Sequence, residues 1–388
     1  MTKFHALIIG GGGTGAALAH DLALRGLQVT LVERGEVTSG TTGRHHGMLH
    51  SGGRYAVKDQ ESARECIEEN QLLRKIAPGS FEENGGLFVA VEDADVEYSH
   101  KLIEGCAECG IPHQRLTREE ALRLEPNLSD NLIMAVHVPD ATFDALRLPL
   151  RFFATAKKNG AVIKPYHEVI DIVKTGQTVT GIKVVDHRSG QEYEIGADIV
   201  INAAGPWSGQ IADMVGVEVP IRPSPGVMLA LHKRLCNMVI NRMTPSGDGD
   251  IIVPQRGLSV VGTSSWVVED PDNLGLPKEH VQMMYDEGAK MVPLVKQTEF
   301  RAAWSAARPL IGPRAADADT GRELSRTFKC FDHVDEGVEG FVTITGGKAT
   351  TLRGMAEVTA NVVVEKLGLD APCLTRETTL LPHTAYYE

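Results

Sequence analysis

The sequence has few cysteines and few aromatic residues. Its six cysteines are spread over 388 residues, and aromatic residues make up 5% of the chain. Scattered thiols do not form the closely spaced framework of a disulfide-rich secreted domain, so we expect reduced cysteines in a cytoplasmic protein. Cys106 and Cys109 form one C-x-x-C pair, but no second pair follows to complete a zinc or iron–sulfur site. We therefore expect no metal site, and two ordinary thiols on a helix that ends at Gly110.

The chain also lacks the signals of membrane and nucleic-acid-binding proteins. No apolar stretch approaches the roughly 20 residues of a membrane span, and the first residues do not have the basic and apolar regions of a signal peptide. A net charge of −12 argues against non-specific binding to nucleic acid or anionic lipid. We expect a cytoplasmic protein with no transmembrane segment and no nucleic-acid partner. Peripheral contact with the inner face of the membrane is compatible with this expectation.

Length and composition are those of a soluble protein with more than one domain. Hydrophobic residues make up 42% of the chain and charged residues 23%, which is ordinary for a globular protein. A chain of 388 residues is long for one compact domain, so we expect two domains or one domain with an inserted cap.

The first 33 residues have the pattern of a dinucleotide-binding βαβ unit. Residues 4–10 and 27–33 read as two buried strands, with a helix-forming segment between them. Gly10, Gly12 and Gly15 have the G-x-G-x-x-G spacing, which permits a tight turn, close approach of a pyrophosphate and close packing of the helix on the strand. The free N–H groups at the start of such a helix bind phosphate. Glu33 ends the second strand, where a carboxylate accepts hydrogen bonds from an adenosine ribose.

This motif does not separate FAD from NAD, and the rest of the chain carries further signals. Residues 168–176, 178–186 and 192–205 read as a β-meander that continues into a buried strand and then NAAGPWSG. Near the C-terminus, GFVTITGG reads as a strand that runs into a helix with Gly346 and Gly347 at its start. A helix start there gives a second positive dipole end for a ligand.

Together these motifs resemble a known enzyme family. The N-terminal βαβ unit, NAAGPWS and the C-terminal strand–GGK–helix are similar to FAD-dependent oxidoreductases of the D-amino-acid oxidase superfamily. Within it, TTGRHHGMLHSGGRYAVKD, WSAARPLIGP and TGGKATTLRG most resemble FAD-dependent sn-glycerol-3-phosphate dehydrogenases, in particular the catalytic A subunits of the anaerobic enzymes. The cysteine-rich iron–sulfur segment of those A subunits does not occur in these 388 residues.

The resemblance implies an α/β fold (α+β overall) of the D-amino-acid oxidase and glutathione reductase type. A Rossmann-like FAD-binding domain would be discontinuous, formed by residues 1–75, 145–215 and 325–388. A substrate domain with a mixed or antiparallel sheet would be inserted as residues 76–144 and 216–324. There is no second G-x-G-x-x-G with a following acid, so no separate NAD site is expected.

The resemblance also assigns residues to FAD. The expected cofactor-binding residues are Gly10, Gly12, Gly13, Thr14, Gly15, Glu33, Arg34, Thr41, Thr42, Arg44, His46, Gly47, Leu49, Val169, Ala204, Gly205, Trp207, Gly346, Gly347, Lys348, Ala349 and Thr350.

Oxidation of a secondary alcohol needs a proton acceptor and, for an anionic substrate, a cationic site. His50 or His46 could take the hydroxyl proton, because imidazole titrates near neutral pH. Arg54 would face the substrate anion. By resemblance, Arg308 and Lys348 would join it, so the expected catalytic residues are His50, Arg54, Arg308 and Lys348.

Several of these residues have structural interpretations that stay open at this point. His46 and His50 could imitate a metal pair, although no third ligand is near in sequence. Arg54 could pair with Asp59 or Glu61, and Arg308 could form a structural ion pair.

One further histidine and two tryptophans have ordinary structural interpretations. We expect His45 at the surface or behind the site, and Trp207 and Trp304 as packing residues.

The expected reaction is oxidation of sn-glycerol 3-phosphate to dihydroxyacetone phosphate by hydride transfer to flavin N5. Electrons would pass to a quinone, a partner subunit or another acceptor that is not NAD. One alternative is an FAD-dependent oxidase or dehydrogenase of a hydroxy acid such as 2-hydroxyglutarate, or of an amino acid. Another is an FAD-binding subunit of an electron-transfer complex with little activity alone.

Overall fold

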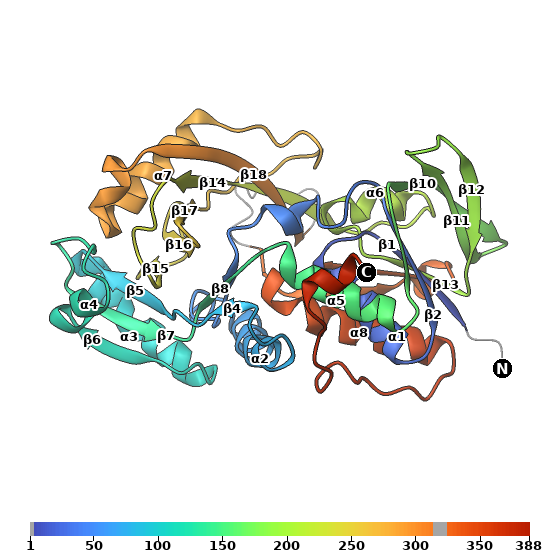
Figure 1. Ribbon diagram of the computed structural model, residues 1–388, viewed down its shortest axis with the longest axis horizontal. Coiled ribbons are helices and arrows are strands. Elements are labelled where there is room, and N and C mark those ends of the chain that lie inside the picture. The colour runs from blue at the N-terminus through green and yellow to red at the C-terminus, as the bar shows by residue number, and fades with distance from the viewer. Residues whose placement is uncertain (1–3, 313–323) are drawn as a thin grey trace.

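The computed structural model describes residues 4–312 and 324–388, which form two lobes side by side along the long axis (Figure 1). One lobe is built on a six-stranded sheet with the order β19-β20-β13-β1-β2-β9. Its strands are β1 (His5–Ile9), β2 (Gln28–Glu33), β9 (Val162–Pro165), β13 (Ile199–Asn202), β19 (Phe328–Asp332) and β20 (Phe341–Gly346). All its neighbours pair in parallel except β19, which is antiparallel to β20.

Helices cover this sheet because its inner strands are apolar on both faces. α1 (Gly13–Leu24) is buried along almost its whole length and lies against α5 (Arg147–Lys158) and α8 (Leu352–Lys366). Strands buried on both faces read as continuous apolar runs, which is why residues 4–10 and 198–202 were recognisable in the sequence. On the other side lies the antiparallel meander of β10 (His167–Thr175), β11 (Thr178–Asp186) and β12 (Glu192–Gly196), followed by α6 (Ser208–Asp213).

The second lobe is an eight-stranded mixed sheet with the order β18-β14-β17-β16-β15-β5-β7-β6. Its strands are β5 (Gly86–Ala90), β6 (Gln114–Thr117), β7 (Met134–Val138), β14 (Ile221–Leu231), β15 (Val239–Arg242), β16 (Ile251–Gln255), β17 (Leu258–Gly262) and β18 (Phe300–Ile311). Its helices are α3 (Asp93–Glu108), α4 (Arg118–Leu124) and α7 (Lys278–Met291). The long pair β14 and β18 runs from this sheet toward the first lobe (Figure 1).

The junction between the lobes holds the histidine-rich stretch of the sequence. It contains a 3₁₀ turn, Thr41–Arg44, and the two-residue strand β3 (Met48–Leu49). β3 pairs with β8 (Ala141–Phe143), which also pairs with β4 (Phe81–Glu82). The helix α2 (Gln60–Ile76) follows, and the Asp59 side chain accepts a hydrogen bond from the Ser62 N–H at its start.

Two glycines of the first βαβ unit explain how strand and helix approach each other. Gly10 has φ +109°, a conformation that side chains disfavour. A Cβ on Gly15 would lie 1.9 Å from the Gly10 carbonyl oxygen, so only glycine allows this contact.

The C-terminal helix begins later than its glycines suggested. Gly346 ends β20, Gly347 also has a positive φ, and a 3₁₀ turn at Ala349–Thr351 precedes α8. Neither glycine is helical, so the expectation of a helix starting at these residues is corrected to a start at Leu352.

Candidate active site

A cavity of about 530 Å³ lies where the two lobes meet. The carboxyl ends of the parallel strands β1, β2 and β13 open onto it, which is the usual ligand position in such sheets. Its lining reaches from Glu33 and Arg34 at one end to Arg54, Arg308 and Lys348 at the other. Segments far apart in the sequence therefore contribute to one continuous space.

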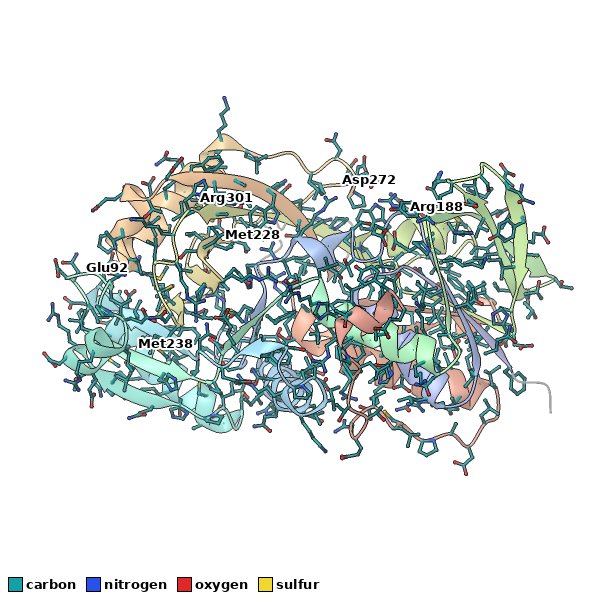
Figure 2. The ribbon with its side chains drawn as sticks, in the orientation of Figure 1. Glu92, Arg188, Met228, Met238, Asp272 and Arg301 are labelled. Atoms are coloured by element: carbon teal, nitrogen blue, oxygen red, sulfur yellow. The ribbon has the colours of Figure 1, made fainter. Side chains whose placement is uncertain are left out.

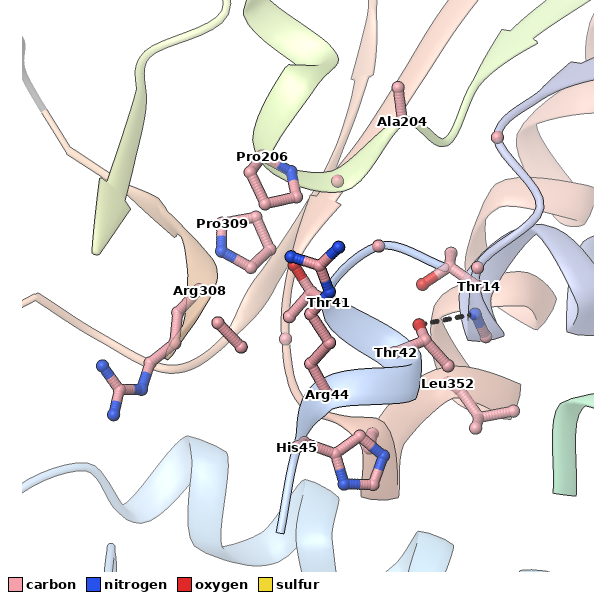
Figure 3. A pocket seen from close by; sticks show the side chains of 18 of the residues that line it. Thr14, Thr41, Thr42, Arg44, His45, Ala204, Pro206, Arg308, Pro309 and Leu352 are labelled. Carbon is pink, nitrogen blue, oxygen red and sulfur yellow. Dashed lines mark hydrogen bonds between the residues drawn. The ribbon is translucent and has the colours of Figure 1, made fainter. Parts of the chain in front are cut away.

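The end near Glu33 has the features of a dinucleotide site. The Glu33 carboxylate accepts hydrogen bonds from the N–H groups of Gly11 at 2.7 Å and Gly35 at 2.9 Å, which fix its direction. Thr42 Oγ1 accepts from the Gly13 N–H at 2.9 Å and so joins the histidine-rich loop to the start of α1 (Figure 3). The glycine-lined helix start and the fixed carboxylate fit the pyrophosphate and ribose of a dinucleotide.

An ion pair closes this end from the second lobe. Asp272, at the tip of a loop that reaches toward the first lobe, accepts hydrogen bonds from Arg34 at 2.5 and 3.3 Å (Figure 2). The Arg34 guanidinium lies 4.5 Å from the centre of the Trp207 ring, and all three residues line the cavity. Trp207 is thus both a packing residue and part of the lining.

The opposite end of the cavity contains Arg308, well separated from Thr14 and Leu352 (Figure 3). Its guanidinium donates to the carbonyl oxygens of Ser224, Pro225 and Ser264 and to the Thr263 hydroxyl. Burial, together with the nearby Arg326 charge, lowers the pKa of Arg308 to about 9. No carboxylate of residues 4–312 or 324–388 forms an ion pair with it, and the Asp250 charge favours its protonated form only as a smaller effect.

Arg326 is a second arginine at this end, partly exposed but with a buried Nη1, and the sequence prediction missed it. It lines the cavity, and its Nη1 has no hydrogen-bond partner within the described chain. Burial lowers its pKa, and the nearby Arg54 charge also lowers it. A buried donor without a partner is costly, which indicates that a ligand supplies the acceptor.

The register of two paired strands explains the position of Arg326. In the antiparallel pair β19 and β20, Phe328 lies opposite Gly346. Continuing this register puts residue 326 opposite Lys348, and Lys348 Nζ does donate to the Arg326 carbonyl oxygen at 2.9 Å.

Two of the expected cations have carboxylate partners. Arg54 forms an ion pair with Asp250, and its Nη2 lies 2.8 Å from each carboxylate oxygen. The expectation that Asp59 or Glu61 would be its partner was therefore wrong. Lys348 Nζ donates to Ser62 Oγ at 3.0 Å and to Glu65 at 3.3 Å. Burial opposes protonation of Lys348, but the pKa is raised overall by neighbouring groups that include Glu65.

The three histidines of the loop line the cavity as neutral groups. Burial lowers the pKa of His45 to about 4 and that of His46 to about 3, and it lowers the pKa of His50 well below its usual value. The charges of Arg54 and Lys348 act in the same direction on His50. Its ring lies 5.6 Å from the ring of Tyr55, another lining residue that the sequence prediction did not assign. A neutral imidazole beside cations can accept a proton from a bound alcohol.

The structure brings most of the expected residues together. All four expected catalytic residues line the cavity. So do eighteen of the expected cofactor residues: Gly10, Gly12, Gly13, Thr14, Glu33, Arg34, Thr41, Thr42, Arg44, His46, Val169, Ala204, Gly205, Trp207, Gly346, Gly347, Lys348 and Ala349.

Four expected residues do not line the cavity and have other surroundings. Gly15 packs on Gly10, and Leu49 is in the core. Gly47 faces Gln255 and Phe143, and Thr350 Oγ1 accepts from the His50 N–H at 3.0 Å.

Metal and membrane-spanning features do not occur in the described parts of the chain. These parts contain no group of three or more His, Cys, Asp or Glu side chains placed to hold a metal ion. No helix in them is long and apolar enough to cross a bilayer. All six cysteines are free thiols.

The strand order, the glycine-lined helix start and the continuous cavity define a dinucleotide-dependent oxidoreductase. The FAD dependent oxidoreductase family (DAO) matches residues 5–361, and the chain belongs to this family. Its cofactor is therefore FAD, as the sequence motifs predicted.

Two relatives are similar over nearly the whole chain. The A1 subunit of the anaerobic glycerol-3-phosphate dehydrogenase of Haloferax volcanii is 44% identical over 96% of this chain, and the A subunit of the Escherichia coli enzyme is 42% identical over the same share. The chain spans 65% and 69% of their respective lengths. The fold is also that of the FAD complex of Bacillus halodurans glycerol-3-phosphate dehydrogenase, with a TM-score of 0.76 at 24% identity, over 98% of this chain and 68% of that one.

Proposed function

We propose that the chain oxidises the secondary hydroxyl of sn-glycerol 3-phosphate to the ketone of dihydroxyacetone phosphate. The observation that carries this proposal is the pair of arginines lining the cavity, Arg308 and Arg326, that form no ion pair with a carboxylate of the described structure. Similarity to glycerol-3-phosphate dehydrogenase subunits supports the same substrate.

Counting charges at the reacting end favours a phosphate over a single carboxylate. Among residues 4–312 and 324–388, four cations line this end, and two of them, Arg54 and Lys348, are paired with Asp250 and Glu65. The two cations that have no paired carboxylate are Arg308 and Arg326, and together they carry two positive charges. A phosphate monoester carries between −1.5 and −2 charge near pH 7, which matches these two charges better than the single charge of an amino acid carboxylate.

The residues divide the work of the reaction. FAD, when bound, supplies the two-electron oxidation of the carbon that carries the hydroxyl. Arg308 and Arg326 bind the phosphate and so place the hydroxyl, and His50 accepts the hydroxyl proton at a ring nitrogen. Tyr55, Lys348 and Ser246 line the same cavity.

The acceptor of the electrons follows from what the chain lacks. No second dinucleotide motif is present, so we infer that a quinone, a partner subunit or another non-NAD acceptor takes the electrons. Relatives named as A subunits support a partner in a larger complex. A cytoplasmic position, or a peripheral one at the inner face of the membrane, is compatible with this role.

The test is anaerobic reduction of the FAD-loaded chain by candidate substrates. Loss of flavin absorbance measures the reduction. Glycerol 3-phosphate should bleach the flavin, whereas 2-hydroxyglutarate, D-amino acids and unphosphorylated glycerol should do so far more slowly. A dye acceptor should restore the absorbance and NAD⁺ should not. Equal or faster bleaching by 2-hydroxyglutarate or an amino acid would contradict the proposal.

His50→Ala should lower kcat for glycerol 3-phosphate by about two to four orders of magnitude, with a smaller change in KM, because a positioned base is lost. The lowered pKa of His50 keeps the imidazole neutral at pH 6.5–8, so the wild-type kcat/KM should stay level across this range and fall only at a pH well below the usual imidazole pKa. Steady-state rates from pH 5 to 8 measure both effects. His45→Ala serves as control and should keep the wild-type pH profile; an unchanged kcat in His50→Ala would exclude the base.

A further inference from the structure

Arg54 is held by a carboxylate as well as by neutral groups. Its Nη2 lies 2.8 Å from both oxygens of Asp250, and its Nη1 donates to Asn241 Oδ1 at 3.3 Å. Both side chains of the ion pair are almost fully buried, at 8% exposure for Arg54 and 5% for Asp250. Arg308 and Arg326, in contrast, have only neutral partners or none among the described residues.

The Asp250 carboxylate is itself fixed by the hairpin between β15 and β16. It accepts a hydrogen bond from the Gly247 N–H at 2.7 Å, and its own carbonyl oxygen accepts from the Arg242 N–H at 2.9 Å. Ser246 Oγ donates to the Arg54 carbonyl oxygen at 3.2 Å from the same hairpin. The carboxylate and the main chain of Arg54 are thus tied to one short loop.

A second buried group supports the other side of Arg54. Asn241 Nδ2 donates to Asp140 at 3.3 Å, and Asp140 accepts from the Ser51 N–H at 2.7 Å. Asn241 and Asp140 are 0% and 1% exposed. The guanidinium therefore has little freedom to turn toward a ligand, and its charge is largely cancelled where it stands.

We propose that Asp250 is a positioning residue that holds Arg54 and cancels its charge, so that the substrate anion is bound by Arg308 and Arg326. This inference rests on the proposed function, because it concerns how tightly the same site holds an anion. Without Asp250, Arg54 would be a third unpaired cation beside the phosphate. It would bind substrate and product more tightly by the same amount, and such uniform binding does not speed the reaction. It would also let Arg54 follow the anion and shift the reacting carbon.

The experiment measures binding of inorganic phosphate to the FAD-loaded protein through the change in flavin absorbance. Asp250→Asn keeps the acceptor for the Gly247 N–H but frees one positive charge, so the Kd for phosphate should fall about tenfold. Its kcat for glycerol 3-phosphate should fall by about the same factor because Arg54 is no longer fixed. Glu287→Gln, next to the outer side of the hairpin, is the matched control and should leave both values unchanged.

Two further variants keep the test decisive if the unpaired Arg54 of Asp250→Asn prevents folding. Arg54→Gln leaves Asp250 as an excess negative charge and should raise the Kd for phosphate about tenfold. The double variant Arg54→Gln/Asp250→Asn restores the wild-type net charge, so its Kd should return to near the wild-type value.

The inference is overturned if Asp250→Asn binds phosphate no more tightly than the wild type, or if the double variant binds it as weakly as Arg54→Gln. Failure of the proposed function looks different. In that case the wild type does not oxidise glycerol 3-phosphate, while the phosphate titration still reports the charge set by Asp250.

Discussion

Replacing Arg308 with alanine should lower kcat/KM for glycerol 3-phosphate by about one to two orders of magnitude. The Nη groups of Arg308 donate to Ser224, Pro225, Thr263 and Ser264, so its Nε–H remains for the phosphate. One charge-assisted hydrogen bond of this kind is worth roughly 1.5–3 kcal/mol. No carboxylate of the described structure forms an ion pair with Arg308, so its charge can attract the phosphate. Arg326→Ala should have an effect of similar size, and steady-state kinetics with a dye acceptor measures both.

Two comparisons separate substrate binding from damage to the protein. Arg301→Ala removes an exposed arginine from the same strand, β18, and should leave kcat/KM unchanged (Figure 2). Unphosphorylated glycerol, already a very poor substrate, should lose far less than glycerol 3-phosphate in Arg308→Ala. If Arg308→Ala loses its flavin or its fold while the remaining holoenzyme keeps normal phosphate affinity, Arg308 is a structural residue and the proposed substrate loses its main support.

Replacing Arg353 with alanine should lower the free energy of unfolding by about 3–5 kcal/mol, because removal of one partner leaves buried charge without compensation. Arg353 is 1% exposed, and it donates to both oxygens of Glu69, to Glu357 at 2.7 Å and to Thr375 at 3.0 Å. Burial raises the pKa of Glu69 even though the arginine opposes this shift. The ion pairs join α2 to α8 behind the cavity.

The matched control for Arg353 is Arg376, which pairs with Glu68 and Glu357 but is 44% exposed. Arg376→Ala should cost at most about 1 kcal/mol, since exposed ion pairs contribute little. Urea denaturation at one fixed, saturating FAD concentration measures both, because bound cofactor adds to stability. If both variants lose the same free energy of unfolding, burial does not determine how much the Arg353 ion pairs contribute to stability.

Local patterns were sufficient to predict the cofactor end of the site. The glycines, the helix and Glu33 lie within the first 33 residues, and their spacing depends only on one strand–helix–strand unit. The buried strands expected at residues 4–10, 27–33 and 198–202 could be predicted for the same reason. Each is a continuous run whose periodicity does not depend on its neighbours.

Long-range pairing was the part that the sequence did not reveal. Arg54 was correctly singled out, but its partner Asp250 is brought to it by the β15–β16 hairpin far along the chain. Lys348 was expected to face the substrate, whereas its donors contact Ser62, Glu65 and the Arg326 carbonyl. Arg326 was missed because its position depends on the register of β19 against β20, which no single segment specifies.

The strand order of the six-stranded sheet also constrains the order in which the chain can fold during its synthesis. β1 lies between β2 and β13, and β13 in turn pairs with β20. The N-terminal strand therefore pairs on one side with a strand that is synthesised much later. During translation the eight-stranded lobe, whose strands lie between residues 86 and 311, leaves the ribosome before the first sheet can close. Domains generally fold as units as they emerge. The nascent βαβ unit therefore has one edge of β1 unpaired until β13 has been made, and an unpaired strand edge can pair with other chains.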